Sequence, residues 1–239
     1  MNTIKIRKNN TLIIAHRGLS GLEKENTACA FIAAGVKGYY ACECDIHKTK
    51  DGKWVICHDD NLNRVGGVDV KIKDYNYKEL LNFKLIDNFT GNKKDYLQIV
   101  SLEDYINICK KYNMHCVIEY KEDFDKNDVL DVINKIKELD YLDNVIFISF
   151  YPNTLIYTKE VLPLQRAQLL ISSYSDEVFS FCNKYNIGID AHYAIITKDI
   201  IDKWHCINQS VNAWTVNDKK IANKLIKNNI DFITSDILE

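Results

Sequence analysis

The chain has 239 residues, of which 46% are hydrophobic and 27% are charged, and its formal net charge at pH 7 is −2. This balance is typical of a globular protein with enough apolar side chains for a core, and it argues against a disordered chain. Because there is no basic excess, the composition also argues against non-specific binding of nucleic acid or of an anionic membrane surface.

Eight short apolar runs predict β-strands. In chain order they are residues 12–15, 39–44, 116–118, 145–150, 167–171, 187–190, 211–214 and 232–234. Stretches in which apolar residues recur at helical spacing lie between most of these runs, for example residues 102–112 and 129–139. Strands and helices are therefore predicted to alternate along the chain.

Capping residues precede several of the predicted helices. They are Asn26 or Thr27, then Ser101, and later Asn217 or Asp218. Strands that are apolar on both faces and separated by helices imply a parallel sheet that is covered on both sides. Eight such units close into a barrel, so we predict an α/β fold with a single (β/α)8 TIM-barrel domain over residues 1–239. An open doubly wound sheet is the structural alternative.

Two features depart from simple alternation. A polar turn at residues 48–53 joins the second strand to a further short run at residues 54–58, which predicts a hairpin that projects beyond the sheet. Residues 59–100 then form a long inserted excursion with too few periodic stretches for a separate domain. Because insertions at the top of a barrel commonly shape the substrate site, we expect this segment to be a rim or lid.

The chain carries no recognisable signal for secretion or for membrane insertion. Its first ten residues lack the apolar stretch of a signal peptide, and no segment approaches the roughly 20 apolar residues of a membrane span. We therefore expect a cytoplasmic protein without stable membrane insertion. The eight cysteines are scattered, mostly inside apolar runs, so we expect reduced and buried thiols. Cys42 and Cys44 lack a matching second pair for a zinc site.

Polar residues stand at the carboxyl ends of the predicted strands, where a parallel barrel places its functional site. Glu43 and Asp45 are two residues apart and hence on one face, and Glu119 and Lys121 repeat this spacing on the next strand. Three converging carboxylates repel one another, whereas a hard divalent cation such as Mg²⁺ or Ca²⁺ prefers oxygen ligands. We therefore predict that Glu43, Asp45 and Glu119 bind one divalent metal ion.

His16 and His58 form the predicted acid/base pair. Hydrolysis of a phosphodiester requires one group that takes a proton and another that protonates the leaving oxygen near neutral pH, and imidazole suits both tasks. Arg17 and Lys121 are the predicted ligands of the non-bridging phosphate oxygens. No comparable setting exists for the other histidines, which are His47, His115, His192 and His205.

The chain closely resembles the glycerophosphodiester phosphodiesterases in a series of ordered motifs: His16-Arg17-Gly18, Glu25-Asn26-Thr27, Glu43-x-Asp45, Thr49-x-Asp51-Gly52, Val55-x-x-His58-Asp59 and Glu119-x-Lys121. Similar segments follow later: Ser149-Phe150, Trp214-Thr215-Val216-Asn217 and Ile233-Thr234-Ser235-Asp236. The resemblance thus spans nearly the whole chain, although the later motifs would be weak alone. One departure is Lys24, which stands where the family commonly has proline.

The resemblance implies the same metal, acid/base and phosphate-binding roles for the seven residues assigned above. It adds that Glu25 and Asn26 support the metal site and orient the catalytic loop, and that Trp214 walls the substrate pocket. The reaction it implies converts small glycerophosphodiesters, such as glycerophosphocholine or glycerophosphoethanolamine, to sn-glycerol 3-phosphate and an alcohol. It leaves open which histidine is the acid. It also leaves open whether water or the neighbouring glycerol hydroxyl attacks the phosphorus.

Three rival functions differ in testable ways. A lysophospholipase D would need an apolar surface for lipid access in the excursion. The apolar side chains of that segment, which more simply pack it onto the barrel, are Tyr75, Tyr77, Leu80, Leu81 and Phe83. A non-catalytic barrel would bind a phosphorylated metabolite without turnover, and the intact metal and histidine positions argue against it. A glycosidase is the weakest rival, because a carboxylate pair explains neither the histidines nor the cations.

Overall fold

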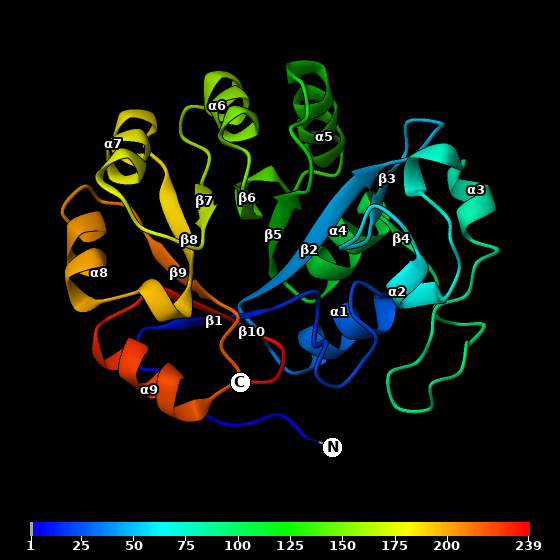
Figure 1. Cartoon of the computed structure of the whole chain (residues 1–239), viewed down its shortest axis with the longest axis horizontal. Helices are drawn as coiled ribbons and strands as arrows, with labels where there is room; N and C mark the ends of the chain where they lie inside the picture. Colours follow the sequence, from blue (N-terminus) through cyan, green and yellow to red (C-terminus); the bar gives the residue numbers. More distant parts are fainter. Residues whose placement is uncertain (1) are drawn as a thin grey trace.

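A closed barrel of eight parallel strands forms the centre of the computed structural model, which describes residues 2–239 (Figure 1). The barrel strands are β1 (Leu12–Ala15), β2 (Ala41–Lys48), β5 (His115–Tyr120), β6 (Val145–Ser149), β7 (Ala167–Ile171), β8 (Gly188–His192), β9 (Val211–Trp214) and β10 (Phe232–Ser235). The ring closes because β1 pairs with both β2 and β10. The predicted TIM barrel is therefore confirmed, and the open sheet is excluded.

Helices surround the ring of strands (Figure 1). They are α1 (Ala28–Val36), α4 (Leu102–Lys111), α5 (Lys126–Glu138), α6 (Pro152–Val161), α7 (Asp176–Tyr185), α8 (Lys198–His205) and α9 (Lys219–Lys227), with short 3-10 turns η2 (Leu142–Asn144) and η3 (Tyr193–Ile195). The sequence offered two candidate N-caps for α1 and two for α9. The side chains of Thr27 and Asp218 accept the backbone hydrogen bonds there, and Ser101 caps α4 as predicted. Helix α5 begins before residue 129, because Asp125 caps its first turn.

Two barrel strands extend beyond their predicted ends. Strand β2 continues to Lys48 because its last residues pair with β3 (Trp54–Ile56) in the predicted hairpin. Strand β5 continues to Tyr120 because Glu119 and Tyr120 pair with strands on both sides. An apolar run marks only the part of a strand without polar side chains, so the runs at residues 39–44 and 116–118 end before Asp45 and Glu119, which the two-residue spacings also place on these strands. Those charged side chains consequently belong to the barrel itself and not to the loops that follow it.

The inserted segment builds a small core of its own beside the barrel. Strand β3 pairs with β4 (Val100–Ser101), and between them lie α2 (Asn63–Gly66), η1 (Ile72–Asp74) and α3 (Tyr77–Leu80). The buried side chains that form this core are Val55, Cys57, Leu62, Val65, Val70, Ile72, Leu80, Leu85, Leu97 and Ile99. The segment is therefore held to the β2–β3 hairpin by apolar burial.

Most apolar residues of the excursion pack inward, although Phe89 and Tyr96 are 53% and 64% exposed. Leu80 is fully buried, and the rings of Tyr75 and Phe83 meet edge to face with centroids 5.6 Å apart. This packing favours the simpler of the two interpretations, in which these side chains attach the segment to the barrel.

None of the helices within residues 2–239 has the length and apolar character needed to cross a bilayer.

The contact between α1 and α4 leaves no space for a side chain at Gly35. A β-carbon built there would lie 2.3 Å from Cγ and 2.7 Å from Cβ of Tyr112, the residue that caps the end of α4. We expect Gly35→Ala to lower the free energy of unfolding by about 1–3 kcal/mol, because overpacking outweighs the gain in helix propensity. Urea denaturation measures this change.

The matched control is Val36→Ala, because Val36 follows Gly35 in the same helix and is 70% exposed. That variant should change the stability by no more than about 0.5 kcal/mol. Equal stabilities of the Gly35→Ala variant and the wild type would show that the two helices can separate without cost.

Candidate functional site

Three acidic side chains meet inside the barrel near the carboxyl ends of its strands. The parallel pairing of β2 with β5 puts Asp45 beside Glu119, and Glu43 lies two residues earlier on the same face. One oxygen from each of the three carboxylates lies within 4.8 Å of the other two. All three residues are buried, with at most 8% exposed. The structure thus brings together the three predicted metal ligands.

Burial and mutual repulsion control the protonation of this cluster. Burial, followed by the charge of Asp45, raises the pKa of Glu119 to about 8. Burial together with the charges of Asp45 and Glu119 also raises the pKa of Glu43 well above its usual range. Burial opposes the ionisation of Asp45 as well, but the Lys121 and Arg17 cations outweigh it and lower the pKa of that carboxyl. Glu119 therefore favours the protonated form near neutral pH, and Glu43 keeps its proton to a higher pH than an ordinary glutamate.

The donor set fits a divalent cation. It consists only of carboxylate oxygens, which hard cations such as Mg²⁺ and Ca²⁺ prefer. Oδ1 of Asp45 is buried without a hydrogen-bond partner, and its nearest cation is Nζ of Lys121 at 3.3 Å. A divalent ion would displace the protons of Glu43 and Glu119, and Oδ1 of Asp45 would coordinate it.

A tight turn after β1 brings Arg17 against the cluster. Its backbone lies in the left-handed region with φ of 53°, and its amide donates a hydrogen bond of 2.7 Å to Glu43 Oε2. Its guanidinium donates to Glu25 at 2.9 Å and lies 3.5 Å from Asp45. On the other side, Nζ of Lys121 lies 2.9 Å from Glu119 Oε1. Two cations thus border the three carboxylates.

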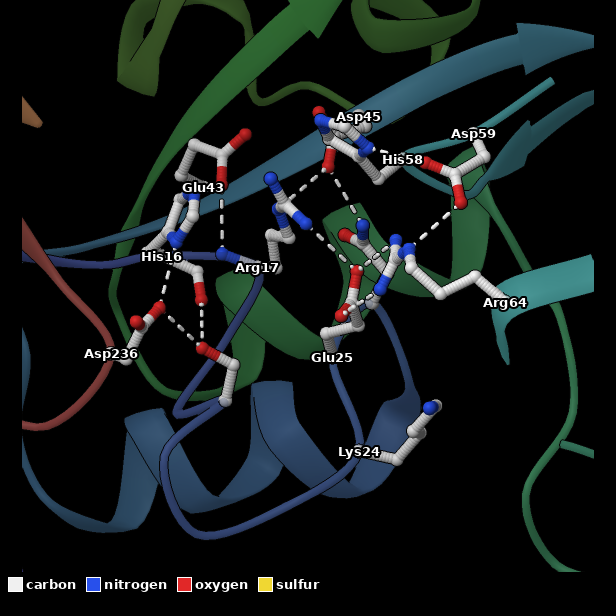
Figure 2. Close-up of polar contacts among 12 residues, drawn as sticks. His16, Arg17, Lys24, Glu25, Glu43, Asp45, His58, Asp59, Arg64 and Asp236 are labelled. Carbon is white, nitrogen blue, oxygen red and sulfur yellow. Dashed lines mark hydrogen bonds and ion pairs between the residues drawn. The ribbon is translucent and has the colours of Figure 1, made fainter. Parts of the chain in front are cut away.

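The Glu25-Asn26 segment links the cluster to the excursion (Figure 2). The Asn26 amide donates to Asp45 Oδ2 at 2.7 Å. Both oxygens of Glu25 accept hydrogen bonds from Arg64, at 2.6 and 2.9 Å, and Arg64 also donates to Asp59 at 2.8 Å. Nothing in the sequence distinguishes Arg64 from a surface cation, because its partners are brought to it by the fold.

Each of the two predicted acid/base histidines has a carboxylate partner (Figure 2). Nδ1 of His16 lies 2.7 Å from Asp236 Oδ1, and Nδ1 of His58 lies 2.6 Å from Asp59 Oδ1. A carboxylate accepts hydrogen bonds, so Nδ1 carries a proton in both rings and Nε2 is left to exchange a proton elsewhere. This arrangement suits a pair of proton-transfer groups.

Burial and neighbouring groups shift the pKa values of both carboxylates and of His58. Burial opposes the ionisation of Asp236, but its hydrogen bond to His16 lowers its pKa to about 2. Burial likewise opposes ionisation of Asp59, and its hydrogen bonds to Arg64 and His58 lower its pKa. Burial lowers the pKa of His58, an effect that Asp45 opposes and the nearby cations reinforce. The lowered pKa favours the neutral imidazole of His58.

One cavity of about 90 Å³ joins these groups. A single water needs only roughly 10–15 Å³ of such space, so the cavity has room for a small ligand. Its lining residues are His16, Arg17, Glu43, His58, Glu119, Lys121, Ile148, Phe150, Leu170, Asp190, Trp214, Thr215 and Thr234. Trp214 meets Phe150 edge to face at 5.7 Å, and its indole N–H donates to the backbone oxygen of Asp190 at 3.0 Å. Trp214 therefore walls the cavity.

A second cavity of about 310 Å³ lies on the outer side of His58. It shares His58 and Lys121 with the first cavity, and its other lining residues are His47, Lys48, Asp60, Ile72, Lys73, Glu122 and Tyr151. His47 is buried here, with Nδ1 at 2.9 Å from Glu122 and Nε2 at 3.3 Å from the backbone oxygen of His58. His47 has no predicted role, because only the hairpin brings it against the backbone of His58.

The comparison with known proteins agrees with this geometry. Residues 16–239 match the model of the glycerophosphoryl diester phosphodiesterase family. The chain is 26% identical over 234 residues to a glycerophosphodiester phosphodiesterase of Bacillus altitudinis, covering 95% of this chain and 94% of that protein.

Solved structures give the same result. A phosphodiesterase of Oleispira antarctica in complex with the product sn-glycerol-3-phosphate superposes with a TM-score of 0.85, at 26% identity and with 94% and 92% of the two chains covered. A glycerophosphodiester phosphodiesterase of Thermotoga maritima superposes with a TM-score of 0.78, at 26% identity and with 96% of each chain covered.

Metal binding should depend on pH, because protons occupy the cluster. Glu119 has a pKa of about 8 and that of Glu43 is also raised, so both bind protons that a cation must displace at lower pH. We expect the affinity for Mg²⁺ or Ca²⁺ to rise between about pH 6 and pH 8, by at most about tenfold per pH unit for each displaced proton. Calorimetry in buffers of different ionisation enthalpy counts the released protons.

A control comes from Asp190, a buried carboxyl outside the cluster whose pKa burial raises to about 8. Asp190→Asn should release as many protons on metal binding as the wild type, whereas Glu119→Gln should release fewer. An affinity that is the same at both pH values would contradict protonation of the cluster.

Proposed function

Since this chain belongs to the glycerophosphoryl diester phosphodiesterase family, whose members are phosphoric diester hydrolases, we propose that it converts glycerophosphodiesters to sn-glycerol 3-phosphate and an alcohol. Glycerophosphocholine and glycerophosphoethanolamine are the proposed substrates. One observation carries this proposal: three buried carboxylates and two carboxylate-paired histidines border a single cavity. The sn-glycerol-3-phosphate in complex with the Oleispira antarctica phosphodiesterase supports the same product.

The binding of the phosphate is assigned to cations on one side of the cavity. Glu43, Asp45 and Glu119 hold Mg²⁺ or Ca²⁺, which when bound polarises a phosphoryl oxygen and offsets its charge. Arg17 and Lys121 bind the non-bridging oxygens. Both cations are fixed by carboxylates before substrate arrives, at 2.9 Å from Glu25 and from Glu119 respectively, so little reorganisation is needed.

His16 and His58 carry the protons. One histidine takes the proton of the attacking hydroxyl through Nε2, and the other donates a proton to the alkoxide as its bond to phosphorus breaks. Asp236 and Asp59 stabilise whichever ring becomes an imidazolium. The attacking group is either water or the neighbouring glycerol hydroxyl, and detection of a cyclic phosphate intermediate, which only the second route forms, distinguishes the two.

The two cavities accommodate the two arms of the diester. They meet at His58 and Lys121, so a phosphate bound there can extend one ester arm into each. We assign the glycerol arm to the narrower cavity inside the barrel and the alcohol to the outer cavity. Asp60, Ile72 and Lys73 line the outer cavity, which supports the proposal that residues 59–100 are a rim of the site. Glu25 and Asn26 support the metal site through Arg17 and Asp45.

A panel of substrates tests this function directly. Glycerophosphocholine, glycerophosphoethanolamine and one lysolipid should be assayed with Mg²⁺, with Ca²⁺ and with chelator. We expect release of glycerol 3-phosphate from the first two substrates that depends on the metal. Preferential hydrolysis of the lysolipid would favour a lysophospholipase D. Tight binding without turnover would instead favour the non-catalytic barrel.

Removal of either imidazole should abolish most of the activity. General acid or base catalysis typically contributes about 10²–10⁴-fold, so we expect His16→Ala and His58→Ala each to lower kcat by about that factor. Steady-state assays of glycerophosphocholine hydrolysis at saturating metal measure the loss. Wild-type turnover by His58→Ala would refute the acid/base assignment.

The negative charge of Asp236, the carboxylate partner of His16, should contribute to turnover. Asp236→Asn keeps the shape of the side chain but no longer stabilises an imidazolium, so we expect kcat to fall by about 10²-fold or more and the pH profile to change. Asp231→Asn is a matched control, because Asp231 pairs with His205 at 2.9 Å away from both cavities. Similar losses in both variants would point to a general effect on folding.

A further inference from the structure

The cavity inside the barrel has two unlike walls. Strands β1, β2 and β5 and the hairpin contribute its charged groups, whereas β6 to β10 contribute a mainly apolar wall. Ile148, Leu170 and Trp214 offer carbon surface on this second wall, and Asp190 is its single carboxyl. The proposed function accounts for the charged wall. It leaves the carboxyl on the apolar wall without a role.

Asp190 is placed on this wall by strand register. It lies on β8, opposite Leu170 of β7 and Asn212 of β9, and it is only 2% exposed. Its backbone oxygen accepts the hydrogen bond of the Trp214 indole at 3.0 Å. The residue is therefore fixed by the barrel and by the tryptophan that walls the same cavity.

The side chain of Asp190 has unused hydrogen-bonding capacity. Its Oδ1 is buried and has no partner. The neighbouring Asn212 uses its Nδ2 to donate to Thr234 Oγ1 at 2.8 Å, and its own Oδ1 also lacks a partner. A buried polar atom without a partner costs free energy, so a carboxyl that lines a ligand cavity is best explained by a ligand that completes it.

The chemistry of this carboxyl suits a hydroxyl group. Burial raises the pKa of Asp190 to about 8, against a smaller opposing effect of Asn212, so the group is a neutral acid near pH 7. A neutral acid offers one O–H donor and an acceptor oxygen, which matches an alcohol that both donates and accepts. The cations that suit a phosphate, Arg17 and Lys121, are held instead by the carboxylates of the charged wall.

We propose that Asp190 is a specificity-determining residue that hydrogen-bonds a hydroxyl of the substrate's glycerol arm. The carbon skeleton of that arm packs on Trp214 and Leu170 while its phosphate lies against the charged wall. This inference rests on the proposed function, because it takes the glycerol arm to occupy the inner cavity. It assigns the discrimination between glycerol esters and other phosphodiesters to one buried side chain.

Two substrates separate binding of the hydroxyl from the chemistry. Glycerophosphocholine has glycerol hydroxyls, whereas bis(p-nitrophenyl) phosphate has none. We expect Asp190→Leu to lower kcat/KM for glycerophosphocholine by about tenfold, mainly through KM, and to change that for the aryl diester by less than about twofold. Asp190→Asn, which also offers a donor and an acceptor, should keep most of the wild-type preference.

Inhibition gives a second measurement that needs no turnover. sn-Glycerol 3-phosphate and 3-hydroxypropyl phosphate differ in the hydroxyl of the central carbon, and propyl phosphate lacks both hydroxyls. We expect the wild type to bind sn-glycerol 3-phosphate about tenfold more tightly than propyl phosphate and Asp190→Leu to lose that preference. If 3-hydroxypropyl phosphate binds as tightly as sn-glycerol 3-phosphate, Asp190 contacts the terminal hydroxyl. If it binds as weakly as propyl phosphate, Asp190 contacts the hydroxyl of the central carbon.

The control variant is Gln168→Leu. Gln168 is also a buried polar residue on the neighbouring strand β7, and its Oε1 also lacks a partner, but it does not line the cavity. It should leave the ratio between the two substrates unchanged. Should Asp190→Leu fail to fold, Asp190→Ala and the inhibition of the wild type by the three phosphates test the same point.

The outcomes are distinct. Equal losses for both substrates in Asp190→Leu, or no loss for either, would overturn the role of Asp190 while leaving the proposed function in place. The absence of any wild-type preference for sn-glycerol 3-phosphate over propyl phosphate would also overturn it. A wild type that cleaves the aryl diester but no glycerophosphodiester would refute the proposed function itself.

Discussion

The site is organised by the repulsion among three carboxylates that the fold holds together away from water. The parallel pairing of β2 with β5 fixes Asp45 beside Glu119, and strand geometry then puts Glu43 on the same face. Like charges in a poorly solvated region cannot all ionise without a compensating cation. The raised pKa values of Glu43 and Glu119 express this conflict. A divalent cation bound between the three carboxylates would resolve this conflict.

The surrounding residues also respond to this concentration of negative charge. The left-handed backbone of Arg17 aims its amide at Glu43, and Lys121 pairs with Glu119. Asn26 donates to Asp45, while Arg64 ties Glu25 to the carboxylate partner of His58. The three predicted metal ligands, the two cations proposed to bind phosphate and the carboxylate partner of His58 are therefore one connected network. A change in any member alters the electrostatics of the others.

The cavity inside the barrel has a charged side and a mainly apolar side. The first barrel strands and the hairpin carry the charged groups, whereas β6 to β10 carry apolar surface and Asp190. The excursion closes the outer side of His58 and has a small apolar core of its own.

Local sequence determined much of this protein. The alternation of apolar runs predicted the barrel, and the two-residue spacings of Glu43 with Asp45 and of Glu119 with Lys121 placed each pair on one face, because strand periodicity is a local property. Only the tertiary structure decided which side chains are the hydrogen-bond partners of these residues. Asp236 reaches His16 from 220 positions away because β10 closes the ring beside β1. Likewise Arg64, His47 and Asp190 resemble ordinary surface or core residues in the sequence, and their roles depend on neighbours that chain closure and strand register supply.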